Sequence, residues 1–404
     1  MTPSKKGLLM NKGCIIVSFM VASLACFLAP GSAWAQTSLD SFLHPYLSQY
    51  GLPALAAAVA RNGTIIAAGA VGTRKAGASI PVTVADRFHI GSDTKAMTAL
   101  LAAMLVEEGR LRWDSTPAEV FPELAPDMDP GFAAVTLEQL LSHSSGLPAD
   151  NAEIAEVWKQ SFFEDGNLDR MRLFILREWS KRPLAALPGQ RFEYSNLGYI
   201  LAGSMLERAA TKTWDELMVE RIFGPLGLAT AGLGCQSSPG KVDAPLGHLA
   251  VNGTVQSFLA GPNADNPPMI GPAGIAHMSV LDFVRWAAWN AGEGRREPAL
   301  VRPETLRKLH SVVMELTPAK DARPGTPRVT GGYGLGWGLV AVDLAPYPLL
   351  QHSGSNVKNL ASVWIDLEKD LAIVLMTNMG GEQADAALKS LARELYLRYA
   401  GPGR

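Results

Sequence analysis

Cysteine is scarce in this chain of 404 residues, which contains only Cys14, Cys26 and Cys235. The first two lie in an N-terminal segment that we expect to be removed, so a single cysteine would remain. One cysteine cannot form an internal disulfide, and it also excludes a cysteine-rich metal site. The fold must therefore be held together by its hydrophobic core.

Charge of either sign is also low. Asp, Glu, Lys and Arg make up 18% of the residues, and the formal net charge is −2. This balance gives no electrostatic reason to expect a nucleic-acid partner. The hydrophobic share of 48% is typical of a globular protein and not of a disordered chain.

Two common catalytic signatures are absent. The chain has no Gly-x-Ser-x-Gly sequence, which argues against an α/β-hydrolase. Its seven histidines show no His-Glu-x-x-His spacing, and we predict neither a metal nor a cofactor. A metal site assembled in three dimensions leaves no such motif, so that alternative stays open. His143, in the stretch "LSHSSG", is expected to be structural.

An apolar run near the N-terminus is a candidate signal peptide. Three lysines precede an apolar stretch at residues 14–29, and the small-x-small sequence "AWA" follows. This order predicts a signal peptide at residues 1–35, cleaved before Gln36. The alternative is a transmembrane anchor, but a spanning helix needs roughly 20 apolar residues and this run is shorter. We expect a periplasmic protein with no stable membrane span after cleavage.

Strand signals occur toward both ends of the remaining chain. Two apolar segments flank Asn62-Gly63, the strongest short-range signal for a tight hairpin, and two β-rich runs flank the polar turn at 368–370. Between them, proline and glycine break a series of helical signals. The final segment has apolar residues at helical spacing.

This pattern predicts one domain of the α+β class at residues 36–404. An antiparallel sheet would be built from residues 36–110 and 325–404 and flanked by helices. A mostly helical region at residues 111–324 would be inserted between the two sheet segments.

The stretch "FHIGSDTKAMTALLAAML" places Ser92 and Lys95 at the start of a strong helix prediction that Gly109 ends. Residues three apart lie on one helix face, which puts the amine near the hydroxyl. A helix N-terminus stabilises developing negative charge, and a desolvated lysine with a lowered pKa can take the serine proton. In the alternative, Ser92 only caps the helix and Lys95 extends to solvent.

Ser-x-x-Lys is a weak pattern by itself, because this chain contains it three times. The match from Ser238 to Lys241 encloses Pro-Gly, which cannot form the required helical turn. The match from Ser355 to Lys358 lies where strand signals begin. Only the first match opens a helix.

Two further motifs offer polar groups for catalysis. In "FEYSNLGYILAG", the phenol of Tyr194 can relay a proton and the amide of Asn196 can hold a substrate carbonyl. In "LLQHSGSNVKN", His352 begins a His-x-Gly motif that leads into strand signals, where an edge strand can offer the N–H of Ser355. His89 begins a second His-x-Gly sequence, so this spacing is also weak alone.

Taken in order, these three motifs resemble those of the class C serine β-lactamases and the related penicillin-binding DD-peptidases and esterases. The segments "VTLEQLLSHSSGLP", "IGPAGIAHMSVLDF" and "YGLGWGL" are similar to that family's segments and occur in the family's order, so the resemblance covers roughly residues 40–400. It implies that Ser92 is a nucleophile that forms an acyl-enzyme. Lys95 and Tyr194 would transfer protons as a unit, with the base left open between them.

The resemblance also implies the substrate contacts. Asn196 would hold the acyl-side amide, and the N–H groups of Ser92 and Ser355 would form the oxyanion hole. His352 would contact substrate where other members carry lysine. A histidine is mostly neutral near pH 7 and anchors a carboxylate less firmly, and Lys358 is an alternative cation.

The implied function is hydrolysis of a β-lactam amide or of a D-alanyl-D-alanine peptide, so the partner would be a small-molecule or peptide substrate. The alternatives are an esterase of the same family acting on small esters, and a penicillin-binding or cell-wall-fragment-binding protein without turnover. The sequence indicates neither the deacylation rate nor the oligomeric state.

Overall fold

The computed structural model describes residues 36–164, 166–261, 264–316 and 331–401. The predicted signal peptide lies outside these residues. Among the described residues, no helix has the length and apolar character that crossing a bilayer requires.

The strands are β1 (Thr37–Ser38), β2 (Ala54–Arg61), β3 (Thr64–Gly72), β4 (Arg87–His89), β5 (Gly232–Leu233), β6 (Gly247–Val251), β7 (Thr254–Phe258), β8 (Ala276–Ser279), β9 (Met314–Leu316), β10 (Gly331–Tyr333), β11 (Gly338–Val340), β12 (Leu349–Ser355), β13 (Leu360–Asp366) and β14 (Leu371–Thr377). The helices are α1 (Asp40–Tyr50), α2 (Thr94–Glu107), α3 (Pro117–Val120), α4 (Pro130–Ala133), α5 (Leu137–Leu141), α6 (Ala152–Ser161), α7 (Leu168–Trp179), α8 (Asn196–Ala210), α9 (Trp214–Met218), α10 (Gly271–Gly274), α11 (Val280–Ala291), α12 (Pro303–Leu309) and α13 (Glu382–Tyr399). Single helical turns are η1 (Gly91–Asp93), η2 (Ala125–Asp127), η3 (Val219–Phe223) and η4 (Pro268–Ile270).

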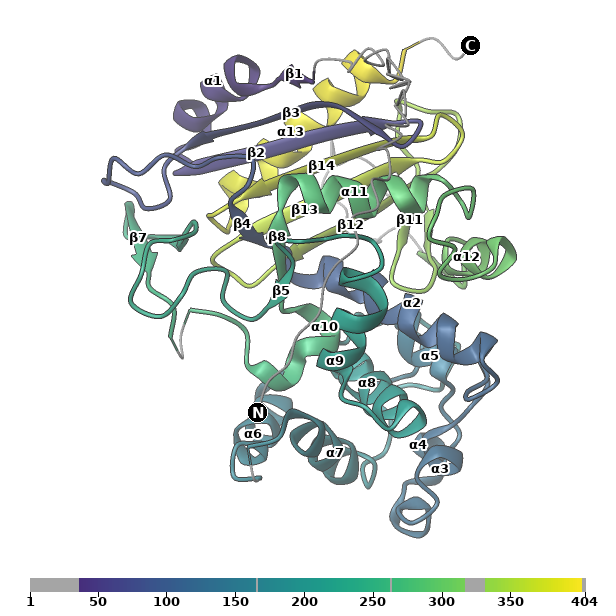
Figure 1. The fold of residues 1–404 in the computed structure, drawn as a ribbon. Coiled ribbons are helices and arrows are strands. Elements are labelled where there is room, and N and C mark those ends of the chain that lie inside the picture. Colours follow the sequence, from purple (N-terminus) through teal and green to yellow (C-terminus); the bar gives the residue numbers. More distant parts are fainter. Residues whose placement is uncertain (1–35, 165, 262–263, 317–330, 402–404) are drawn as a thin grey trace, which may run out of the picture. The chain divides into compact units, whose positions relative to one another are not determined.

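A nine-stranded sheet has the order β1-β3-β2-β14-β13-β12-β11-β10-β9 (Figure 1). Its neighbours are antiparallel except for β1, which pairs with β3 in parallel. Strands from the two ends of the chain meet where β2 pairs with β14. The predicted α+β class, with a sheet built from both termini and flanked by helices, is confirmed.

Strands β2 and β14, which are neighbours inside this sheet, bury nearly all of their residues, so both of their faces are covered. Alternate residues of a strand point to opposite sides, so β14 contributes to two separate cores. Helix α11 covers one face, and helices α1 and α13 cover the other (Figure 1). On the α11 side lie Ala372, Val374 and Met376, and on the α13 side lie Leu371, Ile373 and Leu375.

Two hairpins use the same turn chemistry. Asn62 and Gly63 join β2 to β3 with φ values of +49° and +77°. Asn252 and Gly253 join β6 to β7 with φ values of +51° and +77°. Both pairs have the positive φ values that a two-residue type I′ turn requires. The first hairpin was predicted and the second was not.

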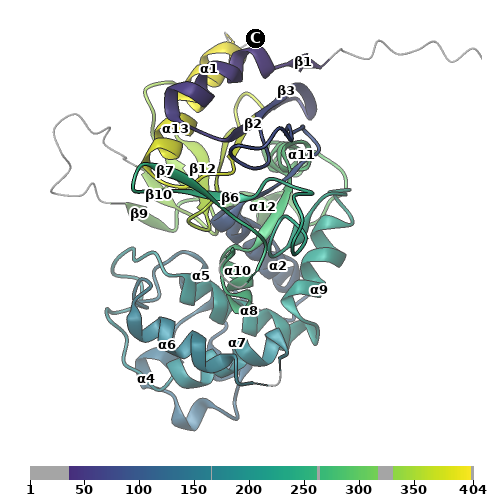
Figure 2. The same cartoon turned by 90° about the vertical axis from the view of Figure 1, so that its left-hand side faces the viewer.

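The region at residues 111–324, predicted to be mostly helical, contains helices and also short strands. Helices α3 to α9 fill residues 117–218, and α4 to α8 group beside one another in both views (Figures 1 and 2). The later residues of that region include five strands, β5 to β9, and helix α11, which packs on the main sheet. Strands of two to five residues give little periodic signal, and β8 pairs with the distant β4.

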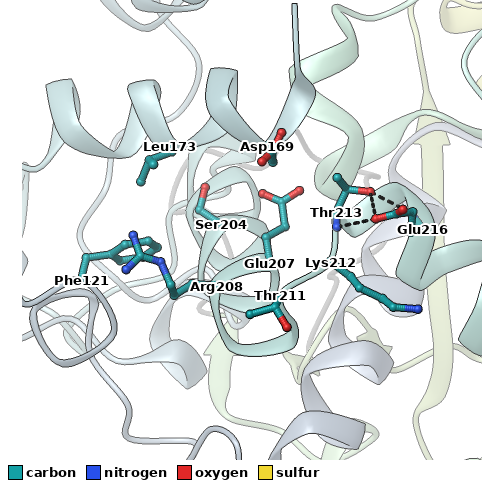
Figure 3. Close-up of a pocket in the computed structure, with 10 residues that line it drawn as sticks. All are labelled: Phe121, Asp169, Leu173, Ser204, Glu207, Arg208, Thr211, Lys212, Thr213 and Glu216. Atoms are coloured by element: carbon teal, nitrogen blue, oxygen red, sulfur yellow. Dashed lines mark hydrogen bonds between the residues drawn. The ribbon is translucent and has the colours of Figure 1, made fainter.

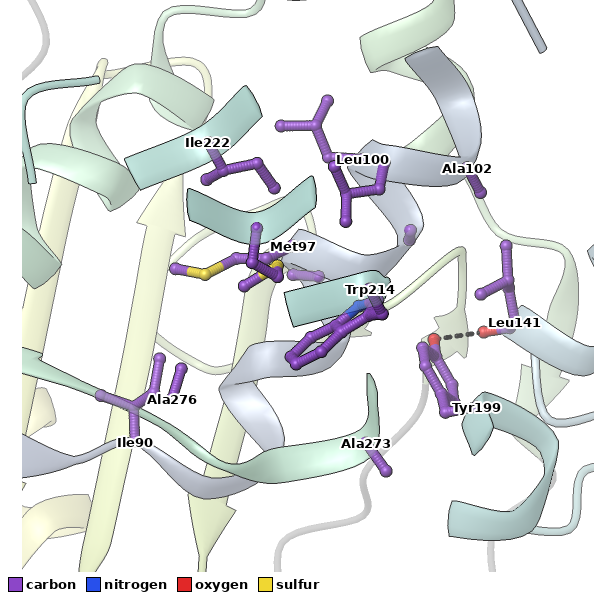
Figure 4. Packing of buried hydrophobic residues seen from close by; sticks show 14 of the residues in the cluster. Ile90, Met97, Leu100, Ala102, Leu141, Tyr199, Trp214, Ile222, Ala273 and Ala276 are labelled. Atoms are coloured by element: carbon purple, nitrogen blue, oxygen red, sulfur yellow. Dashed lines mark hydrogen bonds between the residues drawn. The ribbon is translucent and has the colours of Figure 1, made fainter. Parts of the chain in front are cut away.

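Helix α2 runs through the centre of the larger core. All of its residues from Thr94 to Leu105 are buried, as expected for a helix that is apolar on nearly every side. Met97 and Leu100 lie near Trp214 and Ile222, which belong to the helical part of the chain (Figure 4). This packing fixes the position of the residues at the start of α2.

Candidate active site

Ser92 lies in the tight turn η1 that joins strand β4 to helix α2. Gly91 begins this turn with a φ of +50°, a left-handed conformation that glycine adopts without strain. Its N–H donates to Nδ1 of His89 at 3.0 Å, and its carbonyl accepts from Oγ1 of Thr94 at 2.6 Å. Asp93 is buried whereas Ser92 stays partly exposed. The turn therefore presents one hydroxyl from a fixed backbone.

Lys95 is fully buried, with an exposed fraction of 0%. Its Nζ lies 3.0 Å from Oγ of Ser92, 2.7 Å from Oδ1 of Asn196 and 2.7 Å from the carbonyl oxygen of Ala273. These acceptors match the three donor positions of an ammonium group. The alternative of a solvated lysine beside a capping serine is wrong, since no side chain caps the start of η1 or α2.

The surroundings of Lys95 change its acidity. Burial lowers the pKa of the amine to about 7, because the charged form loses its hydration. The carboxylates of Asp150 and Asp93 act in the opposite direction. A large fraction of the amine is therefore neutral near pH 7 and able to accept a proton from Ser92.

Tyr194 and Asn196 reach the same amine from the start of helix α8. Ser195, which lies between them, caps this helix with its side chain. The centre of the Tyr194 ring is 4.8 Å from Nζ of Lys95. Burial raises the pKa of the Tyr194 phenol, and its hydrogen bond with Ser92 partly offsets this effect. The phenol therefore stays protonated at neutral pH and can donate.

His143 supports this segment from the loop after helix α5. Its Nδ1 accepts the N–H of Ser195 at 3.1 Å, and its ring centre lies 4.3 Å from that of Tyr194. Burial lowers the pKa of His143 well below its usual value, so the ring is neutral. Its contacts are those of a positioning residue, in line with the structural role predicted for it.

Asp150 belongs to this group of residues, although sequence reasoning missed it. Its Oδ2 accepts from Nδ2 of Asn196 at 2.6 Å, and its side chain is exposed. The residue lies in the loop between α5 and α6, 46 positions before Asn196 in the chain. No periodicity or spacing connects the two, so no sequence signal could have paired them.

The end of strand β12 presses against the Ser92 turn. A Cβ placed on Gly354 would lie 1.9 Å from the carbonyl oxygen of Ile90 and 2.4 Å from the nitrogen of Ser92. A Cβ placed on Gly91 would lie 2.2 Å from the nitrogen of Ser355. Only glycine allows this approach, which brings the N–H groups of Ser92 and Ser355 close together. Two such donors can stabilise an oxyanion.

His352 is buried within the same strand. Its Nε2 lies 3.1 Å from the hydroxyl of Tyr333. Its Nδ1 lies 3.4 Å from Oδ1 of Asp93, an ion-pair distance longer than a well-formed hydrogen bond. Both ring nitrogens thus face protein partners, which leaves neither open to a substrate carboxylate. The alternative cation, Lys358, lies over the ring of Phe258 at 5.2 Å.

The second His-x-Gly sequence supports the Ser92 turn from behind. Nε2 of His89 lies 2.8 Å from Oδ1 of Asp265, and the same oxygen accepts from Nδ2 of Asn356 at 2.9 Å. His89 thereby ties the turn to the loop before α10 and to the loop after β12. The sequence favoured the His352 motif over this one because His352 leads into strand signals, but it did not predict the supporting role of His89.

Two cavities lie elsewhere, and none of the six predicted site residues lines either of them. One of about 330 Å³ lies in the helical part and includes Asp169, Ser204 and Glu207 in its lining (Figure 3). The other, of about 490 Å³, lies beside β4 and β8. In the part of the chain that the structure describes, no three His, Cys, Asp or Glu residues form a group able to hold a metal ion. The site around Ser92 is therefore identified from the contacts among its side chains, because neither of these two cavities includes them.

Comparison with known proteins gives a consistent assignment. The beta-lactamase family model matches residues 39–397. Penicillin-binding protein 4 of Amycolatopsis lactamdurans is 26% identical over 335 residues, covering 82% of each chain. The octameric penicillin-binding protein homologue from Pyrococcus abyssi is 25% identical with a TM-score of 0.68, covering 87% of this chain and 76% of that one.

A D-amino acid amidase from Ochrobactrum anthropi SV3 shares the fold. It is 21% identical with a TM-score of 0.65, and the match covers 88% of this chain and 95% of that one. The family match spans both sheet segments and the helical region between them. The chain therefore belongs to the beta-lactamase family, which is made up of serine hydrolases.

Proposed function

We propose that the protein is a serine hydrolase that forms an acyl-enzyme at Ser92 on an amide or ester. The observation that carries this proposal is the contact between the buried amine of Lys95 and Oγ of Ser92 at 3.0 Å. An amine with a pKa of about 7 can remove the serine proton at neutral pH. The proposed steps use only side chains and backbone N–H groups of this protein, and water.

In acylation, Oγ of Ser92 attacks the carbonyl carbon while its proton passes to neutral Lys95. The N–H groups of Ser92 and Ser355 hold the negative oxygen that forms. The bond to the leaving group then breaks, and the leaving group takes a proton from the phenol of Tyr194. Lys95 returns its proton to Tyr194, so an ester at Ser92 and a neutral leaving group remain.

In deacylation, water attacks the ester carbonyl and gives its proton to the pair of Lys95 and Tyr194. Collapse of the tetrahedral intermediate breaks the bond to Oγ, which regains a proton from the same pair. The two groups interact closely, so the pair and not one member acts as the base. Asn196 can hold an amide carbonyl of the acyl group where the substrate has one.

The choice of acyl donor depends on the side of the site near His352. β-Lactams and D-alanyl-D-alanine peptides both carry a carboxylate close to the scissile bond, and His352 already faces Asp93 and Tyr333. This arrangement favours amides and esters without that carboxylate. Small esters fit this description, as do the amides that the name of the D-amino acid amidase indicates. Turnover of a β-lactam and penicillin binding without turnover are the competing outcomes.

We further propose that the protein is exported to the periplasm. The proposal rests on the charged, apolar and small-residue order of residues 1–35. Mass spectrometry of the protein purified from its cells would show Gln36 as the first residue; an uncleaved N-terminus would contradict export by this route.

The test of the acyl-enzyme compares Ser92→Ala with Ser238→Ala. Ser238 belongs to a second Ser-x-x-Lys match, is partly exposed just before the turn at residues 239–240, and donates from its hydroxyl to Oδ2 of Asp243 at 2.6 Å. Turnover of p-nitrophenyl acetate should fall by about 10⁴-fold or more in Ser92→Ala, because the nucleophile is lost. Ser238→Ala should keep the wild-type rate. Retained turnover in Ser92→Ala would refute the mechanism.

Mass spectrometry with a penicillin separates the competing outcomes. An adduct at Ser92 that persists favours a penicillin-binding protein, and an adduct that disappears quickly favours a β-lactamase. Ester turnover at Ser92 with no penicillin adduct supports the amide and ester hydrolase.

A further inference from the structure

One exposed carboxylate lies beside the groups that carry the proposed chemistry. Oδ2 of Asp150 accepts a hydrogen bond from Nδ2 of Asn196 at 2.6 Å, and Oδ1 of the same Asn196 is 2.7 Å from Nζ of Lys95. Lys95 in turn contacts Ser92. One amide group therefore separates Asp150 from the amine that activates the serine.

The carboxylate of Asp150 forms no ion pair with any residue that the structure describes, and its side chain is exposed. An exposed anion at this place repels a negatively charged acyl group and attracts a positive one. Among the described residues, the hydrogen bond to its oxygens comes from the neutral amide of Asn196, so lone pairs stay available to a further donor.

The opposite side of the site supports the same conclusion. His352 is buried, with Nε2 3.1 Å from the hydroxyl of Tyr333 and Nδ1 3.4 Å from Oδ1 of Asp93, and the amine of Lys95 has three acceptors. The described residues in contact with Ser92, Tyr194 and Asn196 thus include no cation that is free to bind a substrate carboxylate. Lys95 is the cation that influences Asp150, and it is buried with three acceptors of its own. An exposed anion at the acyl side therefore favours a substrate that brings its own positive charge.

We propose that Asp150 binds the ammonium group of an acyl donor with a free α-amino group, which makes α-amino acid amides and esters the preferred substrates of this enzyme. The inference rests on the proposed acyl transfer at Ser92 and adds a substrate class to it. An α-ammonium group is attached to the atom next to the scissile carbonyl, on the side where Asn196 and Asp150 lie. A charge-assisted hydrogen bond to Asp150 then helps to place that carbonyl at Oγ of Ser92.

The test compares alanine p-nitroanilide, in both enantiomers, with the matching N-acetyl-alanine p-nitroanilide. Acetylation removes the positive charge and leaves the scissile bond unchanged. For the preferred enantiomer, kcat/KM of the wild-type protein should be about 10- to 100-fold higher with the free amine, the range expected for a hydrogen bond between charged groups. Asp150→Asn should remove most of this preference, mainly through a higher KM for the free amine.

Asp127→Asn is the matched control, because it removes one exposed carboxylate from η2 and should keep the preference. A purely positioning role for Asp150 predicts that Asp150→Asn slows both substrates equally, which would overturn the proposal. A wild-type preference for the acetylated substrate would also overturn it, as would Ser92-dependent turnover of p-nitrophenyl acetate with no turnover of the free amine. Ester turnover that survives in Ser92→Ala would instead refute the acyl-enzyme itself.

Discussion

Lys95 is surrounded by the aromatic rings of Tyr194 and Tyr199 and by the apolar residues of α2, and this environment determines when its amine is neutral. The pKa of about 7 places the change in charge near physiological pH, whereas a solvated lysine titrates near 10.4. Only the neutral amine can accept the proton of Ser92. Activity is therefore linked to burial at this one position.

We predict that kcat/KM for p-nitrophenyl acetate rises with pH through a midpoint near pH 7 and levels off about one unit higher, because the fraction of neutral Lys95 rises through its pKa. Lys95→Arg should lower the rate by about 10²- to 10⁴-fold at every pH, since a guanidinium stays protonated. A pH series at constant ionic strength measures both effects, with circular dichroism confirming the fold. A rate that keeps rising to pH 10 would contradict the lowered pKa.

At the scale of elements, the site depends on the contact between strand β12 and the turn η1. Gly354 permits this contact because its missing side chain leaves room for the carbonyl of Ile90 and the nitrogen of Ser92. These neighbours are backbone atoms of a buried turn and cannot move aside as a flexible side chain can. The spacing of the two oxyanion donors therefore depends on Gly354, together with Gly91 on the facing turn.

We predict that Gly354→Ala lowers kcat by about 10²- to 10³-fold, the loss typical of one oxyanion donor, because β12 must move away from the turn. Gly261→Ala is the control, since the nearest atom to its added Cβ lies 3.9 Å away. Steady-state kinetics and the melting temperature of both variants separate loss of the site from loss of the fold. Wild-type kcat in Gly354→Ala would show that the two N–H groups need not be this close.

Some of these elements could be predicted from the sequence, because their signals are local. The Asn62-Gly63 turn, the helix after Ser92 and the final helix each follow from residues within one element. The contacts of Asp150 and His143 join loops to the start of α8 across 46 and 52 residues. Long-range contacts between irregular segments leave no periodic pattern in the sequence. The motifs therefore identified the reacting groups, whereas the residues that support them could be identified only from the structure.

At the scale of the whole chain from Gln36 onward, the helical region is coupled to the core by a buried charge cluster. Arg172 of α7 donates to Glu207 of α8 at 2.7 Å and also pairs with Asp215 of α9. Trp214, next in this cluster, donates from its indole to Oγ1 of Thr98 in α2 at 3.1 Å. Three helices of the helical region are thus tied to the helix that follows Ser92.

We predict that Arg172→Met lowers the free energy of unfolding by about 3–5 kcal/mol, because it leaves the buried carboxylate of Glu207 without its cation. Lys389→Met is the control: it breaks an exposed pair with Asp385 in α13 and should cost about 0–1 kcal/mol. Urea unfolding measures both values, and Arg172→Met with Glu207→Leu should recover part of the loss by removing the unpaired charge. Equal effects of Arg172→Met and Lys389→Met would mean that the cluster does not couple the helices. A large loss of unfolding free energy in Arg172→Met, with little loss in Lys389→Met, would show that the buried ion pairs at the junction of the helical region with α2 stabilise the fold more than the exposed pair does.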